Sequence, residues 1–176
     1  LRSEFRARGW PAIEMGIGLS TGDMNVGNMG SEVRMAYTAL GDTVNLGSRL
    51  ESQTKNYGVS IIASEAARNA APGFVYRELD RVRVKGKQQP VAIFEPLGHE
   101  GEVDEKLRAE LALNAAALEH YRARDWDGAE KLFMELAQCA TRPVFCRLFL
   151  WRIGYLRDLP PDADWDGVFV SRRHEA

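Results

Sequence analysis

Residues 37–51 decide how this chain folds, and they read Tyr37-Thr38-Ala39-Leu40-Gly41-Asp42-Thr43-Val44-Asn45-Leu46-Gly47-Ser48-Arg49-Leu50-Glu51. An extended run ends at a glycine turn, and the turn opens a helix in which Asn45 and Arg49 stand four residues apart. That spacing points an amide and a guanidinium the same way. A polar stripe runs beside an apolar one, as in an ordinary solvated helix face, and Asp42 or Thr43 is available to cap the first free amides.

Three further blocks accompany this helix in a fixed order: Ile17-Gly18-Leu19-Ser20-Thr21-Gly22-Asp23, Val26-Gly27-Asn28-Met29-Gly30-Ser31 and Val84-Lys85-Gly86-Lys87. With these blocks, Glu14 to Glu95 resembles the second half of the catalytic domain of class III nucleotidyl cyclases, which close ATP or GTP into the cyclic 3',5'-monophosphate. The resemblance covers about half of the chain. It implies an α+β fold with a partial ferredoxin-like sheet that lacks its opening strands.

The resemblance assigns roles to three polar residues. It places Asn45 on the ribose and Arg49 on the phosphates, where charge shifts toward the leaving pyrophosphate. A guanidinium is a fixed fork of donors suited to phosphate oxygens, and a preset cation near developing charge is a large catalytic contribution. Lys85 falls where a second phosphate-binding lysine is expected, although a solvated lysine in a hairpin turn has the same pattern.

Thr38 occupies the position that reads the purine in the family that the chain resembles. In that family, adenylate cyclases have aspartate or threonine at this position, whereas guanylate cyclases tend to have cysteine. A hydroxyl both donates and accepts, so it can serve the amine and ring nitrogen of adenine. ATP is therefore the expected substrate. The alternative is that Thr38 is a β-branched strand residue with a structural role.

The metal ligands of the family have no match here. The resemblance implies Mg²⁺ or Mn²⁺ held by two aspartates, but the chain opens at Leu1 just before the strand that follows those segments. Asp23 lies in a tight turn, where aspartate is common for local reasons. We therefore expect a C-terminal fragment that is inactive alone and pairs with a second cyclase subunit, most simply in a homodimer whose other half supplies the metal.

The composition describes an ordinary globular chain with 45% hydrophobic residues and a net charge of -2. This balance gives no reason to expect nucleic-acid or membrane-surface binding. There is no apolar run of the roughly 20 residues that span a bilayer, and the first twelve residues carry charges where a signal peptide is apolar. We expect a cytoplasmic fragment, whose parent could be anchored elsewhere, with Cys139 and Cys146 as buried thiols.

Three regions follow from the pattern of turns and periodicity. They are a cyclase part (1–97), a linker (98–105) and a helical tail (106–176) with a tetratricopeptide-like hairpin, a third helix at about 143–156 and a closing segment that contains tryptophan. In the cyclase part, we predict a hairpin of residues 13–19 and 24–29, an extended piece at 35–40, a helix at 42–55, and strands at 59–63, 74–84 and 90–95, with a short helix that Ser64 caps.

Two functions remain open from the sequence. The first is a piece of an adenylate cyclase with Thr38, Asn45, Arg49 and Lys85 on the substrate side. The second is a non-catalytic signalling module that uses a cyclase half for dimerisation and the helical tail for binding a partner. The first is favoured because a structural relic has little physical reason to present Asn45 and Arg49 together.

Overall fold

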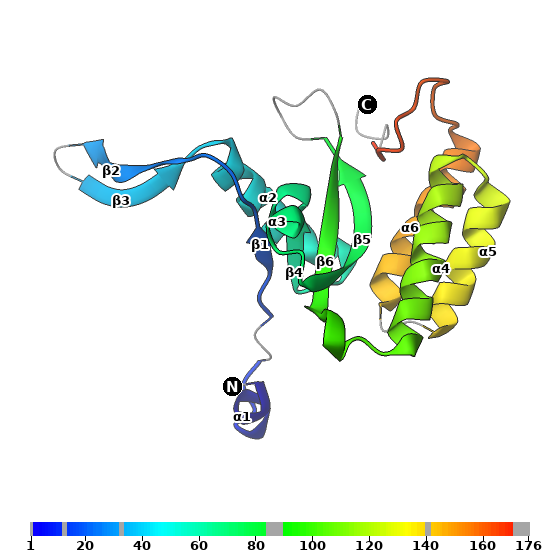
Figure 1. Cartoon of the computed structure of the whole chain (residues 1–176), viewed down its shortest axis with the longest axis horizontal. Coiled ribbons are helices and arrows are strands. Elements are labelled where there is room, and N and C mark those ends of the chain that lie inside the picture. The colour runs from blue at the N-terminus through cyan, green and yellow to red at the C-terminus, as the bar shows by residue number, and fades with distance from the viewer. Residues whose placement is uncertain (1, 12–13, 32–33, 84–89, 140–141, 171–176) are drawn as a thin grey trace.

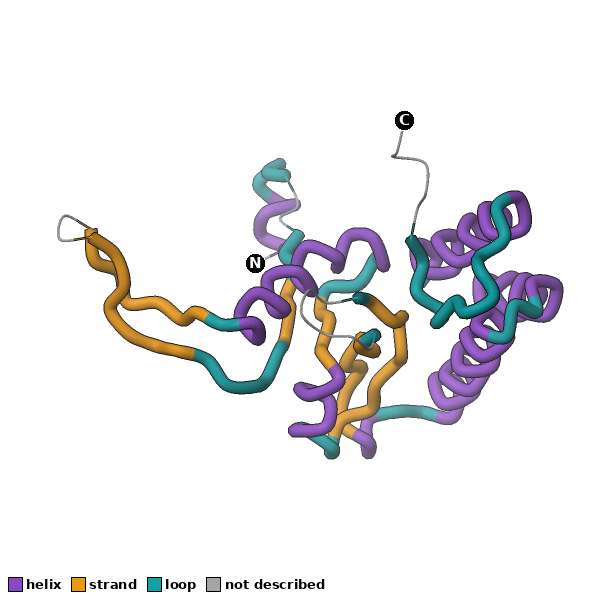
Figure 2. The backbone as a smooth tube through the Cα atoms, turned by 90° about the horizontal axis from the view of Figure 1, so that it is seen from above, coloured by secondary structure: helices purple, strands orange, loops and turns teal. Residues whose placement is uncertain are grey.

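The computed structural model describes residues 2–11, 14–31, 34–83, 90–139 and 142–170. It is a mixed α+β structure with a four-stranded sheet in the middle, a long hairpin that projects from one side and a helical tail packed on the other (Figures 1 and 2). The predicted α+β class is confirmed. The hairpin and the tail lie on opposite sides of the sheet. This placement leaves the first turns of the helix at residues 42–57 accessible.

The elements of the cyclase part are α1 (Arg2–Ala7), β1 (Ile17–Leu19), β2 (Asn25–Ser31), β3 (Arg34–Leu40), α2 (Asp42–Tyr57), β4 (Ile61–Ser64), α3 (Glu65–Ala70), β5 (Phe74–Val82) and β6 (Val91–His99). A 3₁₀ turn at Glu100–Glu102 lies in the predicted linker, and the helices α4 (Glu105–Arg122), α5 (Trp126–Cys139) and α6 (Pro143–Asp158) follow. The predicted strands and helices therefore exist, with boundaries that move by a few residues.

The strands of the sheet lie in the order β1-β4-β6-β5. Strand β1 runs parallel to β4, with Ile17 opposite Ile61, while β6 is antiparallel to both β4 and β5. This arrangement leaves β1 at one edge with Leu19 43% exposed, and Met15 just before it is 69% exposed. An apolar edge of this kind favours association with another surface.

The predicted hairpin between residues 13–19 and 24–29 is wrong. Strand β2 pairs instead with β3, from Asn25 opposite Leu40 to Ser31 opposite Arg34, and β1 joins the main sheet. The physical reason is that β2 and β3 follow each other closely along the chain, whereas β1 completes the sheet by parallel pairing with β4. The alternation of residues along each strand identified the strands but not their partners.

The predicted central helix is confirmed and is two residues longer, because α2 ends at Tyr57 before Gly58. Gly58 adopts the left-handed conformation with φ of 67° and its N–H donates to the carbonyls near the helix end, as a glycine C-cap does. The expectation that Asp42 or Thr43 caps the first turn is wrong, because Gly41 holds the N-cap position and no side chain caps it.

The sheet and the helical tail share one hydrophobic core. It runs from Leu50 of α2 and Ile93 of β6 to Phe133 of α5 and Phe149 of α6 without interruption. Helix α6 packs against α5 and α2, and its Phe149 also meets Tyr121 of α4 with ring centroids 5.1 Å apart. The sheet-containing part before residue 98 and the helical tail after it therefore pack together as one body.

The two cysteines differ from the expectation of two buried thiols. Cys146 is buried in α6, and its burial raises the pKa of its thiol to about 11, but Cys139 is exposed at the end of α5. None of the helices in the described residues has the length and apolar character that a membrane crossing requires.

Candidate functional site

Helix α2 is fixed on the sheet by its inner face. Gly47 of this helix meets Gly18 of β1 so closely that a methyl group on Gly18 would collide with the carbonyl oxygen of Gly47 and lie 2.6 Å from the backbone nitrogen of Glu51. Leu46 and Leu50 are buried beside this contact. Both residues of this contact are glycines, but the contact between the two elements was not predicted from the sequence.

The outer face of α2 presents Asn45 and Arg49. Four residues turn a helix by about 40° beyond a full circle, so the two side chains stand almost in line, while Gly47 points to the opposite side. Both are exposed, and neither side chain has a hydrogen bond or ion pair with any other residue that the structure describes. The geometry gives an amide and a guanidinium that are available to a ligand.

Gly18→Ala tests how α2 is held. The added methyl group meets backbone atoms of α2, so the helix must shift away from β1, and overpacking of this kind lowers the free energy of unfolding by about 1–3 kcal/mol. The measurement is urea unfolding followed by circular dichroism. Gly27→Ala is the matched control because a methyl group there meets nothing within 4 Å. Equal losses in the two variants would contradict the close contact.

Thr38 lies on β3, two residues before that strand ends, and is exposed. It is paired with Gly27 of β2, which has no side chain to cover it. Because α2 begins at Asp42, Thr38 stands at the end of the hairpin nearest the helix. The structure thus brings Asn45 and Arg49 together on one helix face and puts Thr38 on the adjoining strand.

Lys85 lies outside the described residues, as does the turn that the sequence predicts around it. Strand β5 ends at Val82 and carries Arg81, and Arg83 follows it. Both arginines, together with Arg49, line a cavity of about 460 Å³. Sequence reasoning missed Arg81 and Arg83, although their spacing of two residues places them on the same side of an extended strand.

The described residues do not fit a divalent metal. They hold no group of three or more His, Cys, Asp or Glu side chains that could bind one. Asp23 is exposed in the turn after β1, as a turn residue would be. We therefore derive no chemical step through a metal from this chain.

The structure thus combines a four-stranded sheet with an exposed amide and guanidinium pair on the outer face of α2. The model of the adenylate and guanylate cyclase catalytic domain family matches residues 2–94, a little over half of the chain. The chain belongs to this family.

Known proteins of this family are similar over the same part. Adenylate cyclase 1 of Rhizobium meliloti is 40% identical over 97 residues, which are 54% of this chain and 15% of that protein. The adenylate cyclase of Anabaena cylindrica is 40% identical over 91 residues, 49% of this chain and 18% of that protein. The chain thus spans less than a fifth of the length of these curated relatives.

Two solved structures are also similar. The adenylyl cyclase CyaB from P. aeruginosa has a TM-score of 0.48 at 32% identity, over 58% of this chain and 53% of that one. The guanylyl cyclase Cya2 has a TM-score of 0.47 at 32% identity, over 58% of this chain and 52% of that one.

Proposed function

We propose that this chain supplies the nucleotide-facing half of an adenylate cyclase site, which converts ATP into cyclic 3',5'-AMP and pyrophosphate. The 3'-hydroxyl gives up its proton to solvent and its oxygen forms a bond to the α-phosphorus, while the bond from that phosphorus to the oxygen that bridges it to the β-phosphate breaks and pyrophosphate leaves with that oxygen. Asn45 holds the ribose in place for this attack. Arg49 binds the phosphate oxygens on which negative charge grows as pyrophosphate leaves.

One observation carries this proposal: Asn45 and Arg49 lie on the same helix face, both are exposed, and neither side chain has a partner among the described residues. An amide and a guanidinium held on one helix and left open to solvent keep their donors available to a ligand, and the fixed fork of guanidinium donors suits phosphate oxygens. Lys85 is proposed as a second contact to the phosphates.

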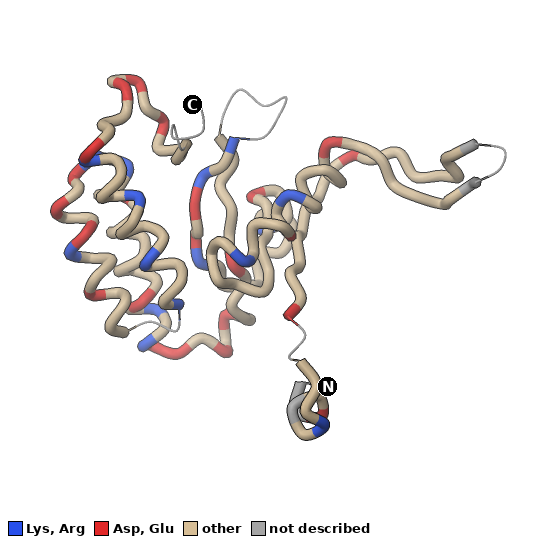
Figure 3. The backbone as a smooth tube through the Cα atoms, turned by 180° about the vertical axis from the view of Figure 1, so that it is seen from behind, with Lys and Arg blue, Asp and Glu red and all other residues tan. Residues whose placement is uncertain are grey.

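The hairpin supports a shared site with a second subunit. It has almost no charged residues along its length (Figure 3), and Val26, Tyr37 and Leu40 are 52%, 75% and 54% exposed. An exposed apolar surface of this kind marks an interaction site. In our proposal the second subunit, most simply another copy of the parent protein, covers the hairpin and brings Mg²⁺ or Mn²⁺ with its own ligands.

A complementation assay tests this function. This chain is mixed with a complete class III cyclase domain. In that domain, the asparagine and the arginine that correspond to Asn45 and Arg49 have both been replaced by alanine. Cyclic AMP formation should rise with the concentration of added chain and reach a plateau. Asn45→Ala should abolish the rescue, whereas Asn69→Ala, an exposed asparagine on α3, should not. A flat rate at saturating chain would favour the non-catalytic dimerisation module.

Thr38→Cys tests the choice of base in the same mixture. A thiol is a weak donor and a weak acceptor, so it serves the amine and ring nitrogen of adenine less well than a hydroxyl does. The ratio of ATP to GTP turnover should fall by about tenfold, which corresponds to one hydrogen bond of about 1 kcal/mol or slightly more. An unaltered ratio would assign Thr38 a structural role in β3.

A further inference from the structure

The cavity beside Arg49 is built jointly by the cyclase part and the tail. It lies between α2, the end of β5 and the closing segment, which we define as residues 159–170 and which lines the cavity with Val168, Phe169 and Val170. Its volume of about 460 Å³ is within the range of small-molecule sites. Neither Asn45 nor Thr38 lines it, so it is a different space from the proposed ribose and base positions.

Positive charge dominates the lining of this cavity. Among the described residues that line it, four are arginines, Arg49, Arg81, Arg83 and Arg152, and one is a carboxylate, Asp80. Asp80 is already engaged, because its Oδ2 accepts hydrogen bonds from Arg152 at 2.6 Å and from the Tyr57 hydroxyl at 2.7 Å. The lining therefore carries an excess of cationic groups over anionic ones.

Two of these arginines have donors to spare. Arg81 lies 4.0 Å from Glu78, but Oε1 of Glu78 also accepts a 2.6 Å hydrogen bond from Arg122. The guanidinium of Arg49 has no partner in the part of the chain that the structure describes. Because guanidinium groups bind phosphate oxygens through paired donors, this side of the cavity suits a phosphate group.

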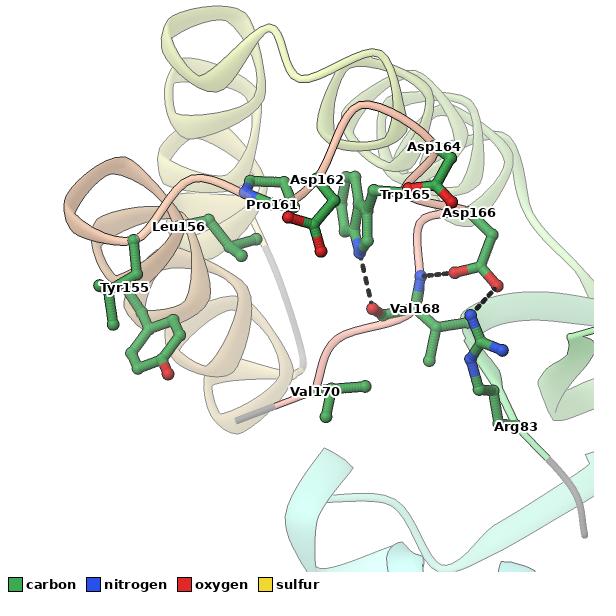
Figure 4. A pocket seen from close by; sticks show the side chains of 11 residues that line it. Arg83, Tyr155, Leu156, Pro161, Asp162, Asp164, Trp165, Asp166, Val168 and Val170 are labelled. Carbon is green, nitrogen blue, oxygen red and sulfur yellow. Dashed lines mark hydrogen bonds and ion pairs between the residues drawn. The ribbon is translucent and has the colours of Figure 1, made fainter. Parts of the chain in front are cut away.

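The opposite wall is apolar and is held firmly. The closing segment is pinned by hydrogen bonds from Trp165 Nε1 to the Val168 carbonyl at 2.7 Å and from the Val168 N–H to Asp166 at 3.1 Å, and Asp166 accepts a third from Arg83 at 2.8 Å (Figure 4). This segment contributes Val168 and Phe169 to the cavity. The wall fits a short apolar or ring-shaped group.

A neighbouring cavity beneath the same segment has the opposite character. It measures about 240 Å³ and is lined by Asp162, Asp164 and Asp166, with Arg83 at its edge (Figure 4). Asp166 is paired with Arg83, and the charges of Asp162 and Asp164 repel an anion, so an anionic ligand is directed to the arginine-lined cavity.

We propose that the arginine-lined cavity binds a small phosphate monoester with an apolar or ring portion. The phosphate binds Arg49 and Arg81, and the apolar portion packs against Val168 and Phe169. The proposed function uses Arg49 to bind the nucleotide, so a ligand in this cavity draws that side chain away and inhibits cyclisation. The inhibition rests on the proposed function, whereas the binding of the phosphate monoester does not.

Calorimetric titration of the complete chain with phenyl phosphate, without nucleotide or metal, tests the binding. We expect saturation at one molecule per chain and a dissociation constant lower than that of inorganic phosphate. Arg81→Ala should raise the dissociation constant about tenfold or more, as loss of a charge-assisted hydrogen bond does. Arg147→Ala, an exposed arginine of α6 outside the cavity, should change it less than about twofold.

Several results would overturn the proposal: no saturation with phenyl phosphate, equal weakening by Arg81→Ala and Arg147→Ala, or phenyl phosphate that binds no more tightly than inorganic phosphate. The calorimetric titration needs no catalytic turnover, so its result is independent of the complementation assay. A chain that binds phenyl phosphate but does not restore cyclic AMP formation leaves this site intact and removes the proposed function. A chain that restores cyclic AMP formation but does not bind phenyl phosphate removes only this site.

Discussion

Arg49→Ala should lower cyclic AMP formation in the complemented assembly about 10²-fold or more, because it removes a preset donor from the place where charge develops on the leaving pyrophosphate. Arg49 is exposed, and its side chain makes no hydrogen bond or ion pair within the described residues, so removing that side chain should leave folding intact. The effect should fall on kcat. The measurement is the initial rate at saturating ATP and saturating chain.

The control for this prediction is Arg147→Ala, which removes an exposed guanidinium from α6 and should leave the rate unchanged. Arg49→Lys separates charge from shape: a point charge on a flexible stem should restore only a small part of the rate, since it cannot present the paired donors of arginine. Full activity of Arg49→Ala with the chain saturating would remove Arg49 from the mechanism.

Asp80→Asn should lower the free energy of unfolding by about 3–5 kcal/mol, because it leaves the buried guanidinium of Arg152 without its counter-charge. Asp80 is 3% exposed and Arg152 is 8% exposed. The pair joins β5 to α6, and the Tyr57 hydroxyl of α2 donates to the same carboxylate. This cluster therefore connects three elements at the base of the helix that carries Arg49.

The tyrosine in this cluster stays protonated at ordinary pH. Burial, followed by the charge of Asp80, raises the pKa of Tyr57 well above its usual range, so its hydroxyl remains a donor. For Arg152, burial pulls the pKa down, but Asp80 and the nearby tyrosines outweigh that pull and raise it. The guanidinium is thus charged in every accessible condition, and Asp80→Asn leaves that charge uncompensated.

Urea unfolding of Asp80→Asn and of Asp158→Asn gives the comparison. Asp158 is exposed at the end of α6, and its substitution should change stability by no more than about 0.5 kcal/mol. Because sheet and tail share one core, loss of the Asp80 pair should lower a single transition and not split it in two. Similar stabilities of the two variants would show that this buried pair contributes little.

The sequence predicted α2 well because its signals are local. Gly41 precedes the helix, Gly58 ends it in a left-handed conformation, and Asn45 and Arg49 fall on one face by helical spacing alone. Ser64 was likewise predicted as the cap of α3, and its Oγ does accept a hydrogen bond from the Ala67 N–H at 3.2 Å. Local chemistry decides such features without help from distant residues.

Features that depend on distant residues were missed. Strand alternation is the same whether β2 pairs with β1 or with β3, so the pattern could not decide between them. The ion pair of Asp80 and Arg152 joins residues 72 apart, and no periodicity connects them. The cavity beside Arg49 needs the closing segment to fold back onto α2, which only the three-dimensional structure reveals.

Photolabelling tests most directly whether the outer face of α2 meets the nucleotide. An ATP analogue with an aryl azide on its γ-phosphate is irradiated in the assembly of this chain with the complementing cyclase domain, and the labelled peptides are identified by mass spectrometry. We expect label within residues 42–57 that disappears when unlabelled ATP is in excess and is weaker in Arg49→Ala. Label confined to residues 105–158, or label that excess ATP does not displace, would contradict it.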